Sequence, residues 1–387
     1  MNVKSIVNGK VLYKGKFHTD LVVIFEAVIE EVLSVNAYDQ YKMTHPSIEE
    51  IDGKGDYILP GFIDVHTHGY KGIDTMDGDV DQLEKMSELI TENGVTAFLP
   101  TTMTMPMEAI AKALDTVIEL KAKDSSKGAI VLGAHLEGPY INEGFKGAQP
   151  SEFIRLPQVS FIEKYKEIIK VMTIAPEVDG AIEMIEAYKD RINFSLGHTG
   201  ASYEQALKAY ETGAKGTTHL FNAMTGLHHR KPGVVGAALT CDCYSEVIAD
   251  NFHVNPGLFK LLVKAKGLEK LLLITDCMRA GGLEEGMYTL GGQEVTMKKG
   301  QCTLANGTIA GSVLKLHEGL KNVTEAVEEE LSDVVALVTE NQAKYLGVED
   351  RMGTLDLGKE ANIVIMNATY DIEMTLVRGN KVYENRI

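Results

Sequence analysis

The sequence predicts an α/β protein that combines a TIM-like (β/α)8 barrel with a small β-sandwich domain built from both termini. Eight strand-like runs, most of them separated by helical patterns, occupy the middle of the 387-residue chain, as such a barrel requires. Both ends contain only strand-like runs, so 1–56 and 358–387 are assigned to the small domain and 57–357 to the barrel. A doubly wound open sheet is the alternative, but no glycine-rich nucleotide fingerprint follows the first barrel strand.

The strand candidates of the small domain are short and rich in β-branched residues. They are 5–13, 21–25 and 27–35 near the N-terminus, and 361–366 and 374–383 near the C-terminus. The last run contains Gly379-Asn380, which predicts a turn between two strands. Because the two ends share this character and flank a different middle, we expect them to form one domain.

The barrel strands are expected at 59–69, 95–100, 129–137, 171–175, 193–198, 216–221, 245–250 and 271–276. Helical patterns separate most of them, at 80–93, 107–123, 161–170 and 202–212. The last helix has clear boundaries, since Ser202 and Gln205 form a capping-box pattern and Gly213 follows its end. Residues 281–311 interrupt the alternation and predict a hairpin-rich insertion beside the last barrel strand.

Charge and composition restrict the partners. The chain has 38 basic and 55 acidic side chains, a formal charge of −17, which argues against nucleic acid and against an anionic membrane surface. No apolar run approaches the ~18 residues that span a bilayer. The N-terminus lacks the apolar stretch of a secretory signal, so we expect a cytoplasmic protein. The four cysteines form no C-x-x-C pair and indicate buried free thiols.

Two histidines mark the end of the first barrel strand. Successive side chains of an extended chain point to opposite faces, so Asp64, His66 and His68 share one face. Imidazoles at positions i and i+2 converge on one point, as in a metal site. A hydrogen-bonded histidine pair is the alternative, but a polar face at the end of an apolar strand is costly without partners.

Other polar groups end other predicted strands: Glu137 the third, His198 the fifth, His219 the sixth and Asp276 the eighth. A lone histidine is more often a satisfied core residue, but these strand ends meet at the face where such barrels carry their reacting groups. A divalent metal would compensate the buried cluster. Histidines with a carboxylate suit Zn²⁺ or Fe²⁺. The sequence therefore predicts metal-assisted hydrolysis, in which Asp276 takes a proton from a metal-activated water and later returns it to the leaving group.

These motifs resemble the amidohydrolase superfamily. The likeness rests on the strings HLEGP at 135–139, THLFNAM at 218–224 and TDCMRAGG at 275–282. It extends over essentially the whole chain, including the split β-domain. The strings are similar to those of superfamily members that deacetylate phosphorylated amino sugars. The resemblance implies hydrolysis of the N-acetyl group of N-acetylglucosamine 6-phosphate to glucosamine 6-phosphate and acetate.

The resemblance also implies a ligand set. It assigns the principal metal to Glu137, His198 and His219, and the proton transfer to Asp276. Some members lack the first-strand His-x-His and use one metal. Because this chain has that pair, the resemblance implies a second metal on it, bridged by Glu137. One or two divalent ions per subunit, zinc or iron, are therefore expected.

The resemblance further assigns contacts to the substrate and a homodimeric assembly. The contact residues are Ala148, Gln149, Asn222, Ala223, Arg230, His253, Ile309, Ala310, Gly311 and Ser312. Arg230 lies in the densest cationic run, 228–231, and suits bidentate phosphate binding within one subunit or across the dimer interface. A solvated loop is the alternative for this run, and the role of His228 and His229 stays open. Some members have a histidine where Gln149 stands, and glutamine can donate only a neutral hydrogen bond.

The same sequence bears on other functions. Hydantoinases and dihydroorotases use a carboxylated lysine on strand four, and 171–177 contain no lysine; the His-Ala-x-Glu string of nucleoside deaminases is missing too. N-acetylgalactosamine 6-phosphate is an alternative substrate, because it differs from the glucosamine sugar at one epimeric hydroxyl and no motif shows which epimer is bound. A non-catalytic sensor of amino-sugar phosphates should have lost a metal ligand or Asp276, and the sequence has lost neither.

Overall fold

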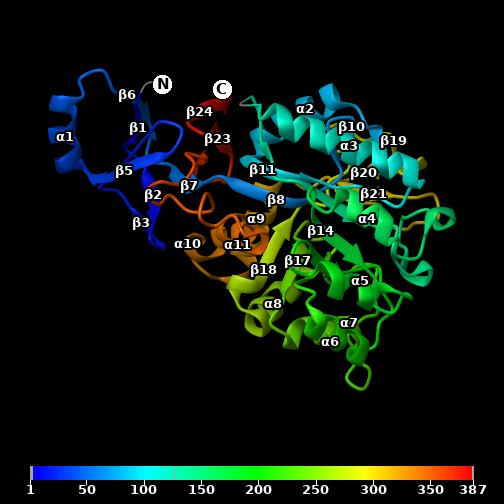
Figure 1. Cartoon of the computed structure of the whole chain (residues 1–387). Helices are drawn as coiled ribbons and strands as arrows, with labels where there is room; N and C mark the ends of the chain where they lie inside the picture. The colour runs from blue at the N-terminus through cyan, green and yellow to red at the C-terminus, as the bar shows by residue number, and fades with distance from the viewer. Residues whose placement is uncertain (1–2, 126, 386–387) are drawn as a thin grey trace.

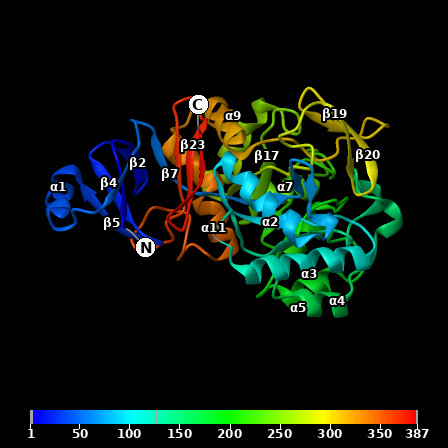
Figure 2. The same cartoon turned by 90° about the horizontal axis from the view of Figure 1, so that it is seen from above.

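The structure is a computed structural model that describes residues 3–125 and 127–385 (Figures 1 and 2), so the outermost residues of the predicted small domain, 1–2 and 386–387, lie outside the described residues. Parallel strands form the centre, in a three-stranded sheet of order β12-β11-β8 and a six-stranded sheet of order β13-β14-β15-β16-β17-β18. Their bounds are β8 (Phe62–Thr67), β11 (Val95–Pro100), β12 (Ile130–Val131), β13 (Ala134–Glu137), β14 (Ile169–Ile174), β15 (Asn193–Leu196), β16 (Gly216–Thr217), β17 (Tyr244–Ile248) and β18 (Leu271–Ile274).

Parallel pairing continues across both gaps between these two sheets. Thr101, just after β11, pairs with His135 of β13. On the other side, Thr67 of β8 pairs with Cys277, which follows β18. Successive parallel strands therefore lie side by side around a TIM-like barrel.

The third barrel strand is broken in two. The expected strand 129–137 is instead β12 and β13, with Gly133 between them. A Cβ at Gly133 would lie 2.5 Å from the Ile168 carbonyl oxygen and 2.5 Å from Cγ of Lys170. Only glycine fits this close approach, and the pairing of β13 with β14 is irregular directly after it, between Ala134 and His135.

Helices flank the strands (Figure 1). The α-helices of this part are α2 (Val80–Leu89), α3 (Met107–Lys123), α4 (Val159–Tyr165), α5 (Ala181–Tyr188), α6 (Tyr203–Thr212), α7 (Gly233–Thr240), α8 (Phe259–Lys266), α9 (Leu316–Val327), α10 (Leu331–Val334) and α11 (Glu340–Leu346). The 3₁₀-helices are η1 (Thr75–Asp77), η2 (Ile90–Asn93), η3 (Glu143–Phe145), η4 (Ser151–Phe153), η5 (Pro256–Leu258), η6 (Leu268–Lys270) and η7 (Val335–Val338).

Three of the four predicted helices are confirmed. Residues 80–93 form α2 and η2, 107–123 form α3, and Ser202 caps α6 through the predicted capping box. The prediction of a helix over 161–170 is wrong at its C-terminal end, because Ile169 and Lys170 already belong to β14. The buried β-branched residues there fit a strand better than a helix.

Two further sheets contain the ends of the chain. One has the order β5-β4-β1-β6 and is N-terminal throughout, whereas the other, β24-β23-β22-β7-β2-β3, combines both ends. Figure 1 shows these blue and red strands next to each other. The bounds are β1 (Lys4–Val7), β2 (Lys10–Tyr13), β3 (Lys16–His18), β4 (Leu21–Phe25), β5 (Ile29–Ser34), β6 (Glu49–Asp52), β7 (Tyr57–Pro60), β22 (Ile363–Met366), β23 (Ile372–Val377) and β24 (Asn380–Glu384).

One helix and one turn in these sheets differ from the prediction. Helix α1 (Val35–Thr44) was not expected, since Tyr38 is its only buried residue among those described and it lacks an apolar stripe. The turn before β24 is Arg378-Gly379 rather than Gly379-Asn380, with φ of 46° and 71° at the two central residues.

The predicted hairpin-rich insertion is confirmed. It is an antiparallel sheet of β19 (Gly286–Leu290), β20 (Gln293–Lys298) and β21 (Gln301–Thr303). A small hairpin of β9 (Gly69–Tyr70) and β10 (Ile73–Asp74) follows β8. All four cysteines are free thiols, but the prediction that they are buried holds for Cys243, Cys277 and Cys302 and is wrong for Cys241, which is half-buried. Within the described ranges, no helix combines the length and apolarity needed to cross a bilayer.

Candidate metal centre and active-site cavity

Three predicted site residues lie at sharp turns just beyond their strands. His198, His219 and Asp276 each stand two residues after the last residue of β15, β16 and β18, respectively. Their φ angles are 48°, 31° and 48°. Left-handed backbone is uncommon for residues other than glycine and is concentrated at functional sites. The predicted strands that contain these residues are therefore too long, because the backbone turns at each of these three residues.

Glu137, the last residue of β13, lies at the centre of the site. Its Oε1 is 3.1 Å from Nε2 of both His198 and His219. Its Oε2 is 3.3 Å from Nε2 of His68, and His66 Nε2 is 3.5 Å from Oε1. The predicted ligands of the principal metal thus form one buried group, whose ligand atoms all lie within 4.8 Å of one another.

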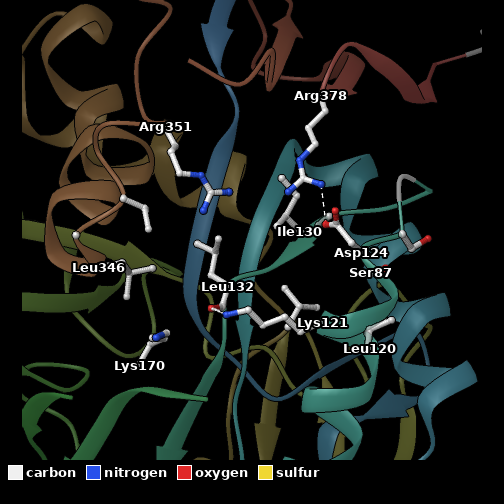
Figure 3. A pocket seen from close by; sticks show the side chains of 15 residues that line it. Ser87, Leu120, Lys121, Asp124, Ile130, Leu132, Lys170, Leu346, Arg351 and Arg378 are labelled. Carbon is white, nitrogen blue, oxygen red and sulfur yellow. Dashed lines mark hydrogen bonds and ion pairs between the residues drawn. The ribbon is translucent and has the colours of Figure 1, made fainter. Parts of the chain in front are cut away.

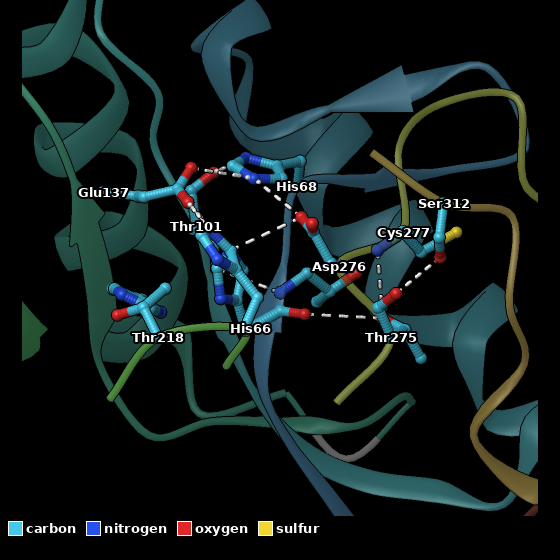
Figure 4. A network of polar contacts seen from close by, with 12 residues as sticks. His66, His68, Thr101, Glu137, Thr218, Thr275, Asp276, Cys277 and Ser312 are labelled. Atoms are coloured by element: carbon cyan, nitrogen blue, oxygen red, sulfur yellow. Dashed lines mark hydrogen bonds and ion pairs between the residues drawn. The ribbon is translucent and has the colours of Figure 1, made fainter. Parts of the chain in front are cut away.

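A second group joins the first-strand histidines to Asp276. Oδ1 of Asp276 lies 3.2 Å from Nε2 of His68 and 3.5 Å from Nε2 of His66. The Asp276 backbone N–H donates to the His66 carbonyl oxygen at 2.9 Å, which fixes the two strand ends beside each other. Figure 4 shows these side chains and Glu137 pointing toward one another. The structure therefore brings together every predicted metal ligand and the predicted catalytic aspartate.

The cluster favours added positive charge. Burial lowers the pKa of His66, but the carboxylates of Glu246, Asp276 and Glu137 outweigh burial and raise that pKa to about 9. Burial raises the pKa of Asp276, yet His66 and His68 bring it down to about 2. Nε2 of His66 is buried without a hydrogen-bond partner in the described part of the chain. Carboxylates and imidazoles that converge around a ring nitrogen without a hydrogen bond are a donor set that fits a divalent cation.

Glu246 of β17 was not predicted as a site residue. Its Oε2 accepts from Nδ1 of His66 at 2.9 Å and from the backbone N–H of His219 at 3.2 Å. Carboxylates in this position fix the tautomer and the orientation of metal-binding histidines. The sequence did carry a signal, because a glutamate inside a strand-like apolar run needs a partner when it is buried.

His135 is buried beside His66 but makes hydrogen bonds of its own. Its Nδ1 lies 3.0 Å from the Val65 carbonyl oxygen and its Nε2 2.8 Å from Oγ1 of Thr173. Burial holds its pKa well below the usual value. His135 therefore acts as a neutral packing residue, as expected for most lone histidines.

The side-chain amide of Gln149 is already engaged within the site. Its Nε2 donates to Oε2 of Glu137 at 2.8 Å, and its Oε1 accepts from the Thr104 backbone N–H at 2.7 Å. In this arrangement Gln149 orients Glu137. To donate to a substrate, as predicted, it would have to give up the first of these bonds.

A cavity of about 320 Å³ opens onto the cluster. The predicted contacts that line it are Ala148, Gln149, Asn222, Ala223, His253, Ile309 and Gly311. His253 is held in place by Asp250, whose Oδ2 is 2.6 Å from Nδ1. Met103 and Leu290 add an apolar wall that was not predicted. Ala310 and Ser312 lie behind the lining: Ala310 is in the apolar cluster below the insertion, and the Ser312 hydroxyl donates to the Thr275 carbonyl oxygen.

Arg230 lies apart from these residues. It is exposed, and it is not among the residues that line the cavity. Its Nη1 is 2.7 Å from Nε2 of His229, and its backbone N–H donates to Nδ1 of His228 at 3.3 Å. Within one chain the structure does not bring Arg230 to the other predicted substrate contacts.

The model of the amidohydrolase family matches residues 57–382, which include every residue of the metal cluster. The chain belongs to the amidohydrolase family. The superfamily membership predicted from the three strings, and with it the hydrolase class, is confirmed.

Relatives of known name resemble the chain over most of its length. The N-acetylglucosamine-6-phosphate deacetylase of Bacillus subtilis (strain 168) is 43% identical over 344 residues, which cover 87% of each chain. The N-acetylgalactosamine-6-phosphate deacetylase of Escherichia coli O157:H7 is 35% identical over 339 residues, 86% of this chain and 89% of the relative. The crystal structure of N-acetylglucosamine-6-phosphate deacetylase from Pasteurella multocida superimposes with a TM-score of 0.93 at 30% identity, covering 99% of this chain and 100% of that one.

Proposed function

We propose that this chain is a metal-dependent hydrolase that converts N-acetylglucosamine 6-phosphate to glucosamine 6-phosphate and acetate. The buried group of Glu137, His198 and His219, with Asp276 and His68 beside it at the base of an open cavity, carries the proposal. The substrate class is supported by the Bacillus subtilis relative of that name, which is 43% identical.

The cluster divides into two cation-binding groups. Glu137, His198 and His219 would hold the principal cation, and His66 and His68 the second, with Glu137 between them. When bound, such a cation polarises the amide carbonyl and makes water a nucleophile at neutral pH. Zinc or iron, one or two per subunit, suits imidazole and carboxylate donors.

Asp276 moves the proton. Its pKa of about 2 keeps the carboxylate ionised at neutral pH, so it can accept the proton of the attacking water. It then returns this proton to the amide nitrogen as the C–N bond breaks, and acetate and the free amine leave. Glu246 and Gln149 hold His66 and Glu137 in position throughout.

The cavity lining supplies the sugar contacts in this proposal. Asn222 and His253 offer polar side chains, and Ala148, Ala223, Ile309 and Gly311 line the same cavity and offer backbone groups. An N-acetylgalactosamine 6-phosphate substrate is the second candidate, since the Escherichia coli O157:H7 relative carries that name at 35% identity.

One experiment tests the activity directly. Metal content is measured on the purified protein, and acetate release is followed with both epimeric phosphosugars. Faster turnover of the glucosamine epimer is expected. Faster turnover of the galactosamine epimer would establish the second candidate, and binding of both without any acetate release would establish the sensor alternative.

We also propose that the chain consists of two domains. Residues 1–56 and 358–387 are proposed to form a β-sandwich domain, and 57–357 a complete (β/α)8 barrel; the pairing across both gaps between the parallel sheets supports the latter. β7 is the element at the boundary, since it pairs with terminal strands. A cytoplasmic homodimer is proposed as the working form.

Replacing His66 with alanine should lower the metal stoichiometry from two toward one per chain. The variant loses a donor of the second group while the three donors of the principal group remain. Elemental analysis after dialysis measures this, and His253→Ala, in the same cavity but outside both groups, is the matched control. An unchanged stoichiometry would rule out the second site.

Replacing Arg230 with alanine should raise KM for the phosphorylated sugar by about 10- to 100-fold, because hydrogen bonds to a charged group contribute roughly 1.5–3 kcal/mol. KM for unphosphorylated N-acetylglucosamine should barely change. Lys231→Ala, the neighbouring cation, is the control. Equal effects on both sugars would remove the phosphate role.

Mixed dimers show which subunit supplies Arg230. If it acts across the interface, subunits carrying Arg230→Ala and subunits carrying Asp276→Asn form heterodimers with one intact site, and activity returns on mixing. If Arg230 acts within its own subunit, mixing restores nothing. The exposed position of Arg230, outside the lining of the cavity, favours the first outcome.

A further inference from the structure

A second cavity, of about 390 Å³, shares no lining residue with the candidate active site. It is lined by the C-terminal end of α3, by β12, by the start of β14, by the segment after α11 and by the turn between β23 and β24. It therefore lies toward the amino-terminal ends of the barrel strands, whereas the metal cluster lies at the carboxyl ends. No role described above uses it.

Cations dominate this cavity (Figure 3). Its charged lining residues include Lys121, Lys170, Arg351 and Arg378. Carboxylates neutralise only part of this charge: Arg378 donates to Asp124 at 2.7 Å and to Glu360 at 3.4 Å, and Arg351 donates to the same Glu360 at 2.5 Å. Of these two carboxylates, Asp124 lines the cavity and Glu360 does not, so two acidic side chains oppose four cations in a chain whose net charge is −17.

The two lysines have no acidic partner in the part of the chain that the structure describes. Nζ of Lys121 donates to the Leu132 carbonyl oxygen at 2.7 Å, and the side chain of Lys170 makes no hydrogen bond or ion pair with any described residue. Burial, reinforced by the positive charges of Lys170 and Arg351, lowers the pKa of Lys121. The side chain of Lys170 passes so close to Gly133 that a Cβ there would lie 2.5 Å from its Cγ. The absence of a side chain at Gly133 therefore leaves room for Lys170.

The lining also contains apolar side chains. They belong to Leu120, Ile130, Leu132, Leu346 and Val348. The volume falls within the ~300–1,000 Å³ of small-molecule pockets, which is far more than one inorganic anion needs. A ligand that fits both the cations and the apolar side chains of this cavity combines a multiply charged anionic group with an organic body.

We propose that this cavity binds the phosphate group of a small phosphate monoester. A phosphate dianion matches the surplus of two positive charges, and the guanidinium N–H groups of Arg351 and Arg378 that Glu360 and Asp124 do not engage can donate to its oxygens. Lys170, unpaired among the described residues, supplies a further donor. Because Arg378 belongs to the β23–β24 turn and Lys121 to α3, the ligand bridges the terminal sheet and the barrel.

The test is calorimetric titration of the metal-loaded protein with glucose 6-phosphate and, separately, with inorganic phosphate. The variant carries Lys170→Gln and Arg351→Gln together. One binding step of glucose 6-phosphate should be weakened at least tenfold in this variant, while any step at the active site stays unchanged. The control carries Lys264→Gln and Arg191→Gln, two exposed cations outside both cavities that remove the same charge.

Each outcome either supports or overturns the proposed phosphate-ester site. Loss of the step in the cavity variant and not in the control supports the proposal, and tighter binding of glucose 6-phosphate than of inorganic phosphate supports the ester. Equal binding of the two at this cavity would assign it to free phosphate and overturn the ester. Equal weakening in both double variants, or no step that depends on Lys170 and Arg351, would overturn the site. Circular dichroism and the melting temperature establish that both variants fold.

Discussion

An Asp276→Asn variant is expected to hydrolyse the acetamide about 10³-fold more slowly than the wild type, in the range of one lost general acid–base group. Asparagine matches the shape of the carboxylate beside His68 but cannot take a proton from water. Glu137, His198 and His219 are untouched, so at least the principal metal should stay bound. Steady-state kinetics and elemental analysis of the same preparation measure both quantities.

The metal content of the Asp276→Asn variant distinguishes two roles of Asp276, proton transfer and metal binding. Asp179→Asn, an exposed aspartate away from the cavity, controls for the loss of one charge. Activity within about tenfold of the wild type, roughly 1.4 kcal/mol of barrier, would show that Asp276 is not the proton carrier. Loss of all metal would make it a ligand instead.

Removing the metal by chelation should abolish turnover and lower the melting temperature by several degrees. A cation that binds only the folded chain adds about 4 kcal/mol at a free concentration 1,000-fold above its Kd. Without it the ionised Glu137 and Asp276 must be balanced by protonated histidines, as the raised pKa of His66, about 9, indicates. Differential scanning calorimetry before and after re-addition of Zn²⁺ or Fe²⁺ measures the effect.

Glu137→Gln provides the matched variant for that experiment. Its side chain has nearly the same size, but it removes the charge that faces four imidazoles. Re-added metal should not raise its melting temperature, whereas Glu163→Gln, on the exposed side of α4, should respond like the wild type. Full activity after exhaustive chelation would exclude a metal-dependent mechanism.

The centre of the site could be predicted because its signals are local. His66 and His68 stand two residues apart on one strand, and Glu137, His198, His219 and Asp276 each end a run that reads as a strand. Barrel topology alone then places all six at one face. Their distances in the structure follow from that placement.

Other features depend on contacts that the sequence does not show. Glu246 becomes a site residue only because β17 passes beside His66 and His219. The sequence prediction extends β15, β16 and β18 too far along the chain. The residues with left-handed backbone that end these strands are His198, His219 and Asp276, and none of them is a proline or a glycine. The position of Arg230 relative to the cavity depends on loop conformation and, in the proposal, on a second subunit.

The pairing of β7 with β22 has a consequence for biosynthesis. Residues 57–60, directly before the strand that ends in His66 and His68, hydrogen-bond with residues 363–366. During translation the early segment leaves the ribosome long before its partner exists, and pairing across so many residues is slow. β7 therefore lacks its partner strand until residues 363–366 have been synthesised, and a chain released before that point should have no activity.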